Sequence, residues 1–584
     1  MAKLLSGTRI YGTGTVDTFF YVNGSTTATN TGTAAAVVAG GLAVGANLCT
    51  GGQIYVQGWA VSTATGASVA TPTSLGTVFG YTTGSGNTAI GCYAGNTSMT
   101  GANNTAVGCC ALRLNSYGNN NTAIGFRALE ANVTGSYNTA IGCCALTNNT
   151  TGCHNTAIGA LALACSVTGS GNIAIGQLAL RCNVFGNNNI ALGGSALTVN
   201  VSGCNNFAAG WNALSSNYGG SFNTAIGCCA LYYNSTGAHN VALGYAALFC
   251  NKSGVNNFAV GNQALKLNST GSNNTAIGCA ALINNTSGYN NFAAGYGALQ
   301  TNSTGVDNTA FGYNALYGNT AGGSNTAIGC MALKNNSTGC NNVAIGYASL
   351  CANTGGNHNA AFGCKTLLAN TTGSYNFAFG YGALRANTTG SNNVAFGVCA
   401  LVSNISGINN FAVGSCASKC NQGGSNNIAI GCAALYGNRT GCNNIALGCF
   451  AMKTGNGGSN NFAAGYGALY GTTTGCSNIG IGYYALNCNS SGAYNVALGV
   501  SALNCNMTGA CNVALGSFAL CGNTCGQGNV AIGVWSMSVN TGTQNIAIGQ
   551  CSGCAITSGN YNVIIGANTG SGFTNTNNNV VLSD

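Results

Sequence analysis

The sequence predicts an all-β fold, an elongated parallel β-roll or β-solenoid of 17-residue repeats. Asparagine recurs with a 17-residue period from Asn87 to Asn529, and glycine follows it four places later, from Gly91 to Gly533. After a one-residue deletion the same frame continues to Asn579. A fixed period in this range is typical of stacked units that contact only their neighbours. We therefore expect one long array instead of several compact domains.

Each repeat predicts a short strand, because its first residues alternate in character with period two. In the repeat N-T-A-I-G-C-C-A-L-T-N-N-T-T-G-C-H, residues 138–154, a small alanine stands at the centre of residues 139–141. Gly142 permits a bend after this strand, and residues 145–146 open a second short apolar segment. Residues 149–152 favour the next corner. We expect two strands and two corners per repeat, because this much Gly, Asn and Thr disfavours helix.

The asparagine that precedes each strand is expected to be structural. Like residues of stacked repeats lie about 4.8 Å apart, and thirty repeats would make a rod of roughly 140 Å. Side-chain amides stacked in this way can hydrogen-bond along the axis, which avoids unpaired burial. Asn-x-Ser/Thr strings arise from the same columns, so we do not interpret them as glycosylation sites. The ladder includes Asn87, Asn104, Asn121, Asn138 and Asn155, and the repeat glycines include Gly91, Gly108, Gly125, Gly142 and Gly159.

Composition restricts the classes of partner. Charged residues make up 3% of the chain, and the formal net charge of +9 is spread over 584 residues. This charge is too sparse for nucleic-acid binding. No run of 18 apolar residues predicts membrane insertion, and the first residues lack the apolar run of a signal peptide. A disordered low-complexity chain is the alternative, but it would not hold one apolar frame through the whole array.

A single 17-residue coil encloses little volume, and its surface carries almost no charge to keep a single rod soluble. Thin rolls of this kind bury a second apolar face by associating around an axis. Alanine and glycine columns would allow close approach, and leucine or isoleucine columns would fill the centre of the assembly. We therefore predict a parallel homotrimer.

The 32 cysteines follow the repeat columns and not the paired spacings of a disulfide framework. Like columns would place their side chains parallel, which matches disulfide geometry poorly. Three Cys-Cys pairs, at 109–110, 143–144 and 228–229, lack the CxxC spacing of zinc sites. We expect small buried or half-buried thiols, with no metal and no cofactor.

The residues for catalysis are few and far apart, so we expect no enzymatic activity. Neither a carboxylate pair nor a Ser-His-Asp set can form within one subunit of a rod. The repeated aspartate of calcium-binding rolls is also missing. The histidines share one column, five places before a repeat glycine, and a surface corner is the expected place for them. The acids are Asp17, Glu130, Asp307 and Asp584, and the histidines are His154, His239 and His358.

Two columns offer candidate contacts to a host glycan. Basic residues recur five places after the repeat glycine, and tyrosines recur directly after it, where their faces would suit sugar rings. A solvated variable column and ordinary packing are the plainer interpretations of the two sets. The candidates are Arg113, Arg181, Lys266, Lys334, Tyr313 and Tyr347.

The strand motif N-T-A-I-G followed by x-x-A-L resembles the SVAIG-type repeats in the head domains of YadA-like trimeric autotransporter adhesins. This resemblance implies left-handed parallel β-rolls assembled as trimers. Residues 27–58, rich in threonine and glycine, resemble the shaft segments of bacteriophage tail fibres, particularly those of marine cyanobacterial phages.

Together these resemblances imply a structural virion fibre of a phage tail or capsid, made in the host cytoplasm and contributing to host-surface adhesion. Residues 1–25 would attach to a baseplate or capsid protein, with Phe19, Phe20 and Tyr21 available for docking. Residues 26–83 would form a β-rich Thr/Gly shaft or linker, and residues 84–584 the array of about 30 repeats.

Two alternatives belong to other classes. A bacterial trimeric surface adhesin would need an export signal, a coiled-coil stalk and a membrane anchor, and the sequence shows none of these. An ice-binding solenoid would need a flat, regular threonine array. The position after each repeat asparagine instead mixes Thr, Val, Ile and Phe.

Overall fold

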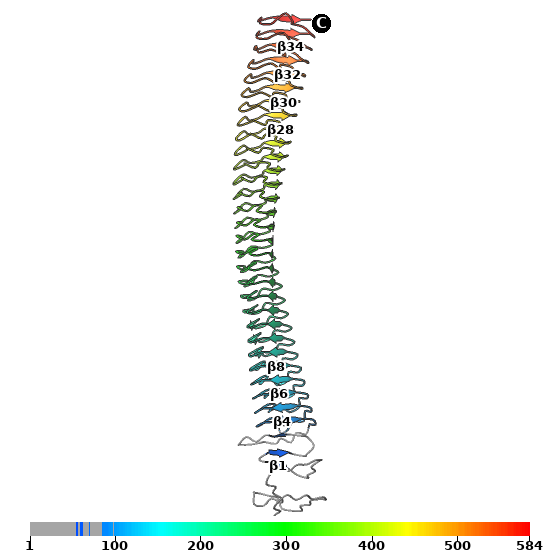
Figure 1. Cartoon of the computed structure of the whole chain (residues 1–584), viewed down its shortest axis with the longest axis vertical. Helices are drawn as coiled ribbons and strands as arrows, with labels where there is room; N and C mark the ends of the chain where they lie inside the picture. The colour runs from blue at the N-terminus through cyan, green and yellow to red at the C-terminus, as the bar shows by residue number, and fades with distance from the viewer. Residues whose placement is uncertain (1–53, 57–58, 62–68, 71–83, 97, 584) are drawn as a thin grey trace, which may run out of the picture.

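The computed structural model describes residues 54–56, 59–61, 69–70, 84–96 and 98–583. The array is a gently curved rod of stacked coils, with the strands on one side and the returning loops on the other (Figure 1). Its strands pair in parallel, and no helix occurs within the described residues. The predicted all-β parallel solenoid of 17-residue repeats is therefore confirmed.

One parallel ladder of thirty short strands runs the length of the rod. Neighbouring strands pair like residue with like residue, as in Thr139↔Thr156 and Ala140↔Ala157. The offset between partners equals one full repeat except where Val530 pairs with Ile546 across the one-residue deletion. The ladder is open, because its described pairings begin at the first of these strands and end at the last. The strands are β4 (Thr88–Ile90), β5 (Thr105–Val107), β6 (Thr122–Ile124), β7 (Thr139–Ile141), β8 (Thr156–Ile158), β9 (Ile173–Ile175), β11 (Ile190–Leu192), β13 (Phe207–Ala209), β15 (Thr224–Ile226), β16 (Val241–Leu243), β17 (Phe258–Val260), β18 (Thr275–Ile277), β19 (Phe292–Ala294), β20 (Thr309–Phe311), β21 (Thr326–Ile328), β22 (Val343–Ile345), β23 (Ala360–Phe362), β24 (Phe377–Phe379), β25 (Val394–Phe396), β26 (Phe411–Val413), β27 (Ile428–Ile430), β28 (Ile445–Leu447), β29 (Phe462–Ala464), β30 (Ile479–Ile481), β31 (Val496–Leu498), β32 (Val513–Leu515), β33 (Val530–Ile532), β34 (Ile546–Ile548), β35 (Val563–Ile565) and β36 (Val580–Leu582).

A separate antiparallel sheet precedes the array. It consists of β1 (Ile54–Val56), β2 (Trp59–Val61) and β3 (Val69–Ala70), in that order. These strands fall inside the segment 26–83 that the sequence assigns to a β-rich linker. The segment 1–25, with the docking candidates Phe19, Phe20 and Tyr21, lies outside the described residues.

The returning half of the coil differs from the prediction of a second strand in every repeat. A second strand forms in three neighbouring coils only, as far as the described residues show: β10 (Cys182–Asn183), β12 (Val199–Asn200) and β14 (Ser216–Asn217). They pair in parallel in the order β10-β12-β14. In the other described coils this half is a turn. The expectation of two strands per repeat was therefore wrong for most of the rod.

Left-handed backbone at the buried leucine prevents a strand at the Ala-Leu positions themselves. This holds even in the three coils with a second strand, where Leu180, Leu197 and Leu214 have φ between 50° and 53° and the strand begins two residues later. Leu146 has φ of 51°, a conformation that costs an L-residue about 1–2 kcal/mol. Full burial of the leucine side chain offsets this cost, since it contributes about 1.5–3 kcal/mol. The Leu146 N–H also keeps a hydrogen bond to the carbonyl of Ala162 in the next coil, at 2.9 Å. Bonding between coils thus continues through a turn, and apolar sequence here predicts burial but not extended backbone.

The core is a narrow column of alanine and leucine inside each coil. Ala140 of the strand and Ala145 and Leu146 of the return are fully buried. The same three positions are buried in the neighbouring coils, and their side chains form one continuous core. The leucine column therefore fills the centre of the single chain. It does not remain available for a trimer axis, as the sequence had suggested for leucine or isoleucine columns.

Near both ends of the described rod, a glycine replaces the core leucine, and a larger apolar side chain nearby fills the space that the leucine would occupy. Gly95 and Gly553 replace the core leucine, and Met99 and Ile556 are buried nearby at 1% exposure. A Cβ on Gly95 would lie 3.8 Å from the Met99 Cε, and one on Gly553 would lie 3.2 Å from the Ile556 Cδ1. The apolar side chain thus occupies space that leucine fills elsewhere, which keeps the terminal coils packed.

Candidate functional site

The five predicted ladder asparagines, Asn87 to Asn155, are all at most 5% exposed and form a continuous hydrogen-bonded column. The Nδ2 of Asn138 donates to the Oδ1 of Asn121 at 3.1 Å and to the carbonyl of Gly152 at 2.9 Å. Its own Oδ1 accepts the backbone N–H of Asn155 at 2.9 Å. Each amide therefore joins three successive coils, and its buried polar atoms find partners.

The repeat glycine is required by both conformation and space. Gly142 has φ of 135°, a region that side chains rarely adopt. A Cβ added there would lie 2.6 Å from the carbonyl oxygen of Gly159 in the next coil. The glycines at Gly91, Gly108, Gly125 and Gly159 have φ between 128° and 136°.

A second buried asparagine column lies on the return side of the coil, and sequence reasoning missed it. The Nδ2 of Asn149 donates to the Oδ1 of Asn132 at 2.8 Å and to the carbonyl of Gly152 at 2.9 Å. Both asparagine columns therefore meet on the same glycine carbonyl. The signal was present in the sequence, because asparagine also recurs with the 17-residue period at this corner. It was interpreted as a turn residue only.

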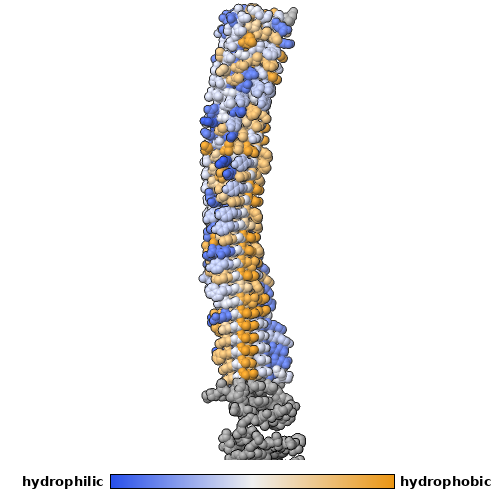
Figure 2. All heavy atoms as spheres, in the orientation of Figure 1, coloured by the Kyte–Doolittle hydropathy of each residue, from blue (hydrophilic) through white to orange (hydrophobic). Residues whose placement is uncertain are grey.

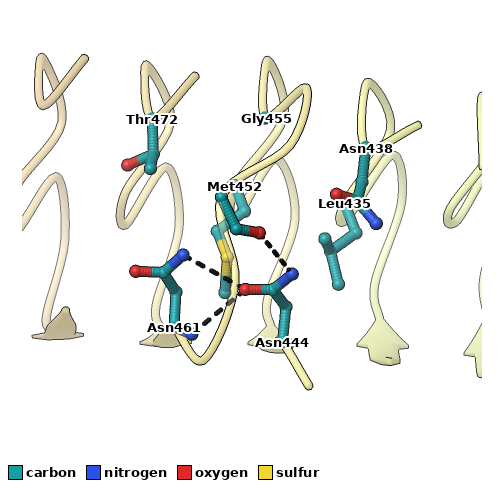
Figure 3. A pocket seen from close by; sticks show the side chains of 8 residues that line it. Leu435, Asn438, Asn444, Met452, Gly455, Asn461 and Thr472 are labelled. Atoms are coloured by element: carbon teal, nitrogen blue, oxygen red, sulfur yellow. Dashed lines mark hydrogen bonds between the residues drawn. The ribbon is translucent and has the colours of Figure 1, made fainter. Parts of the chain in front are cut away.

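The second column is interrupted, and its longest internal interruption leaves a cavity. Gly455 and Thr472 stand where asparagine is expected in two consecutive coils, and the hydroxyl of Thr472 is buried without a partner. The cavity has a volume of about 10 Å³, the lower limit of the space that one water needs. Met452, which replaces the core leucine, extends into it between Gly455 and the first asparagine column (Figure 3).

An exposed apolar stripe follows the strands along the whole rod. The first and third residues of each strand point outward, on either side of a central residue that is alanine in all strands of the ladder except β30, β35 and β36. Ile141 is 36% exposed and Phe311 57%. Figure 2 shows apolar residues gathered in a band along the rod. We call these positions the strand-face stripe; its most exposed members include Ile124, Ile141, Ile158, Ile175, Ile226, Phe258, Ile277, Phe292, Phe311, Ile328, Phe377, Phe379, Phe396, Phe411, Ile430, Ile479, Leu498 and Ile532.

Arg113, a candidate glycan contact, is engaged within the chain. Its Nη2 lies 2.8 Å from the Oε1 of Glu130, one coil further along the same column. Arg127 forms an ion pair with the other oxygen of Glu130, and this hydrogen bond raises the pKa of the Arg127 guanidinium. Glu130 is only 5% exposed. Because an unpaired buried carboxylate would be unfavourable, we assign Arg113 to this internal ion pair.

The other candidate glycan contacts are not brought together. Arg181 is exposed, and Lys266 and Lys334 are half-buried. Tyr313 stacks on Tyr296 with ring centroids 5.5 Å apart, and Tyr347 is exposed. The cations and the tyrosines lie in two columns over many coils, so they do not compose a single site.

A denser arrangement occurs further along the rod. Lys419, Tyr436, Lys453 and Tyr470 occupy the basic column in four consecutive coils. The Lys419 ammonium lies 5.2 Å from the centroid of the Tyr436 ring. The Lys453 ammonium lies 5.3 Å from the Tyr470 ring. The sequence signal was the alternation of lysine and tyrosine at 17-residue spacing, which the search for cations alone overlooked.

The described cysteines are all free thiols, and each is half-buried or exposed. The adjacent Sγ atoms of Cys228 and Cys229 lie 3.3 Å apart. Burial, with the neighbouring Cys228 thiol second, raises the pKa of Cys229 to about 11. No group of three His, Cys, Asp or Glu side chains among the described residues is placed to hold a metal ion.

The three histidines occupy exposed corners, as expected. Each stacks on an aromatic ring of an adjacent coil in its own column. The centroid distances are 4.9 Å for Tyr137–His154, 4.9 Å for Phe222–His239 and 4.8 Å for His358–Tyr375. The histidines are therefore part of separate surface stacks.

Comparison with known proteins assigns no family to this chain. No protein-family model matches it, and a search of curated proteins gave no significant match. The described part of the chain contains no helix that could cross a membrane. The functional argument therefore rests on the ladders, the strand-face stripe and the charged and aromatic columns.

Proposed function

We propose that this protein is a structural fibre of a virus particle, a phage tail or capsid fibre that projects outward and contributes to host-surface adhesion. The observation that carries the proposal is the rod itself. Thirty strands stacked in one ladder extend roughly 140 Å at strand spacing. Hydrogen bonds join each coil to the next on both its strand and return sides. Such a rod can hold its two ends at a fixed distance from each other, which is what a fibre that projects from a particle must do.

We further propose that three chains assemble in parallel through the strand-face stripe. Contiguous exposed apolar surface marks an interaction site, and this stripe continues from β4 to β36. A partner must present apolar groups at the same spacing over the same length. A second and third copy of this chain satisfy that condition, because their coils have the same rise. The resemblance to trimeric adhesin heads favours three chains over two.

The attachment point would be the N-terminal segment, through Phe19, Phe20 and Tyr21, to a baseplate or capsid protein. The fibre would be made in the host cytoplasm and reside in the particle. These assignments rest on the resemblance of residues 27–58 to phage fibre shafts. The glycan-contact role of Arg181, Lys266, Lys334, Tyr313 and Tyr347 stays a proposal within the same adhesive function.

The test combines oligomeric state with location. We expect light scattering of the purified protein to give three times the chain mass, and antibodies against the array to label phage particles. Substitution of Ile226, Ile277 and Ile328 by serine should shift the protein toward monomer. The matched control changes three exposed threonines on the polar corner to alanine and should remain trimeric: Thr236, Thr270 and Thr304. A monomeric wild-type protein would contradict the trimer, and label confined to bacterial envelopes would favour the surface adhesin.

A further inference from the structure

The four-coil column of alternating lysine and tyrosine holds two ammonium groups in fixed places. Lys419 and Lys453 are two coils apart, about 10 Å along the rod at strand spacing. The neighbouring Tyr436, whose ring centroid lies 5.2 Å from the Lys419 ammonium, raises the pKa of that group. Lys453 lies over two rings, 4.7 Å from the Phe450 centroid and 5.3 Å from that of Tyr470. These contacts restrict the two side chains before any ligand arrives, which lowers the entropic cost of binding.

A pair of exposed rings is connected to this column through Phe450, whose ring lies under the Lys453 ammonium and contacts Tyr466 edge-on at 5.5 Å. Tyr466 and Tyr483 stack with centroids 5.5 Å apart and planes 13° apart. They are 41% and 51% exposed. Tyr484 contacts both rings edge-on, at 5.6 Å and 4.4 Å. The exposed parts of these two stacked rings offer aromatic surface for contact with a linear ligand that runs along the rod.

The charge around these coils has one sign. Between Asp307 and the end of the described chain there is no acidic residue, whereas five basic residues occur from Lys365 to Lys453. A negatively charged ligand therefore meets attraction without a competing carboxylate. The charge is nevertheless too sparse for the phosphate density of nucleic acid. The five basic residues are Lys365, Arg385, Lys419, Arg439 and Lys453.

The interior of the same coils departs from the repeat. Gly455 and Thr472 interrupt the second asparagine column there, and Met452 replaces the core leucine beside the cavity (Figure 3). Methionine is flexible and adapts to irregular space. The return segments that carry Lys453 and Tyr470 are thus held by fewer side-chain hydrogen bonds than those of regular coils. These coils therefore differ from the regular repeat in two ways: lysine and tyrosine side chains gather on their surface, and the asparagine column inside them is interrupted.

From these observations we infer that the coils from Lys419 to Tyr484 bind a linear anionic polysaccharide. Lys419 and Lys453 would pair with carboxylate or sulfate groups, and Tyr466 and Tyr483, in the two coils after that of Lys453, would contact sugar rings further along the same polymer. We name the four side chains the cation–aromatic patch. The inference rests on the proposed adhesive function and places its ligand contact in one section of the fibre.

Binding to immobilised full-length protein tests the inference, with dextran sulfate and alginate as sulfated and uronate probes and neutral dextran as the uncharged comparison. We expect at least one anionic polymer to bind and dextran to bind at least about tenfold more weakly. Which anionic polymer binds more tightly distinguishes sulfate from carboxylate recognition. Binding should weaken as salt rises, because the cations are partly exposed. Stronger binding of single-stranded DNA than of either polysaccharide would overturn the inference.

Matched variants distinguish the patch from diffuse charge. Substitution of Lys419 and Lys453 by glutamine should weaken binding about tenfold or more. The control removes two lysines outside the patch by substituting Lys252 and Lys365 with glutamine, and should change binding less than about twofold. Equal losses in the two double variants would overturn the inference.

The aromatic pair has its own control on the same rod. Substitution of Tyr466 and Tyr483 by alanine should weaken binding about fivefold. The same change at the stacked pair Phe518 and Trp535, whose ring centroids lie 4.2 Å apart, should leave binding unchanged. Circular dichroism and thermal midpoints must match wild type in all variants. If every variant binds like wild type, the inference fails, while trimer mass and particle labelling still decide the fibre proposal separately.

Discussion

Two sections of the rod show which contacts a coil can lose. From Asn183 to Asn438 both asparagine columns are complete, whereas the coils that carry Gly455 and Thr472 keep only the first. The strand pairing keeps the 17-residue offset in both sections, as in Thr275↔Phe292 and Phe462↔Ile479. The first column continues as well, since the Nδ2 of Asn461 donates to the Oδ1 of Asn444 at 3.1 Å. The strand ladder and first column therefore suffice for stacking, and the second column adds local order.

The largest expected effect comes from a glycine of the regular section. A Cβ on Gly271 would lie 2.3 Å from the carbonyl oxygen of Gly288 and 2.5 Å from the Oδ1 of Asn268. Gly271→Ala should therefore destabilise the local coils by about 3 kcal/mol or more. In the interrupted section, the nearest atom to a Cβ on Gly455 is the carbonyl oxygen of Thr472 at 3.3 Å. Gly455→Ala should be near neutral, as hydrogen exchange of the neighbouring amides would show.

Equal protection of the two glycine variants would contradict the expected clash of a Cβ on Gly271 with the next coil. Hydrogen exchange is the suitable measurement, because stacked repeats can open locally and a single unfolding midpoint would average over the rod.

Substitutions of intermediate effect compare how much the first and the second asparagine column each stabilise the coils of the regular section. The Oδ1 of Asn274 accepts both the backbone N–H and the Nδ2 of Asn291, at 3.0 and 3.1 Å. Asn274→Ala leaves several buried groups unpaired and should cost about 2–3 kcal/mol. Asn268→Thr, which imitates the natural interruption, should cost about 1 kcal/mol. Local opening free energies from hydrogen exchange check this order, and a larger loss for Asn268→Thr would reverse the ranking of the columns.

The smallest effect should come from repairing the interruption. Gly455→Asn with Thr472→Asn would restore the amide column between Asn438 and Asn489. We expect a gain of about 1 kcal/mol or slightly more, because buried groups regain hydrogen bonds. Slower amide exchange over residues 444–489 would show the gain. If the repaired coils exchange faster, the space around Met452 does not accommodate a second amide.

Periodicity predicted the strands well because each one depends on local alternation. Thr139–Ile141 and the bend at Gly142 were both expected from single residues and their spacing. The left-handed conformation of Leu146 was not expected, because the apolar character of a residue predicts burial but does not determine the sign of φ. Asn149 was interpreted as a turn residue, although its period indicated a second ladder.

Contacts between coils were partly predictable from register. Arg113 and Glu130 are one repeat apart and therefore neighbours in one column, so their ion pair could have been expected. The cavity beside Met452 could not have been expected from the sequence, because its size depends on the combined side-chain volumes of three substitutions in adjacent coils. The cation–aromatic patch required both the column and the ring geometry.

The one-residue deletion shows where this architecture tolerates change in length. Val530 still pairs with Ile546, and the backbone N–H of Asn545 still bonds to the Oδ1 of Asn529 at 2.9 Å. The shortening is absorbed at the corner between Asn540 and Gly542, which are two residues apart where Asn523 and Gly526 are three apart. Equivalent corners recur along the rod at strand spacing, so they are regularly spaced candidate positions for inserting residues. Short foreign peptides grafted there could be displayed at chosen intervals without disturbing the spine.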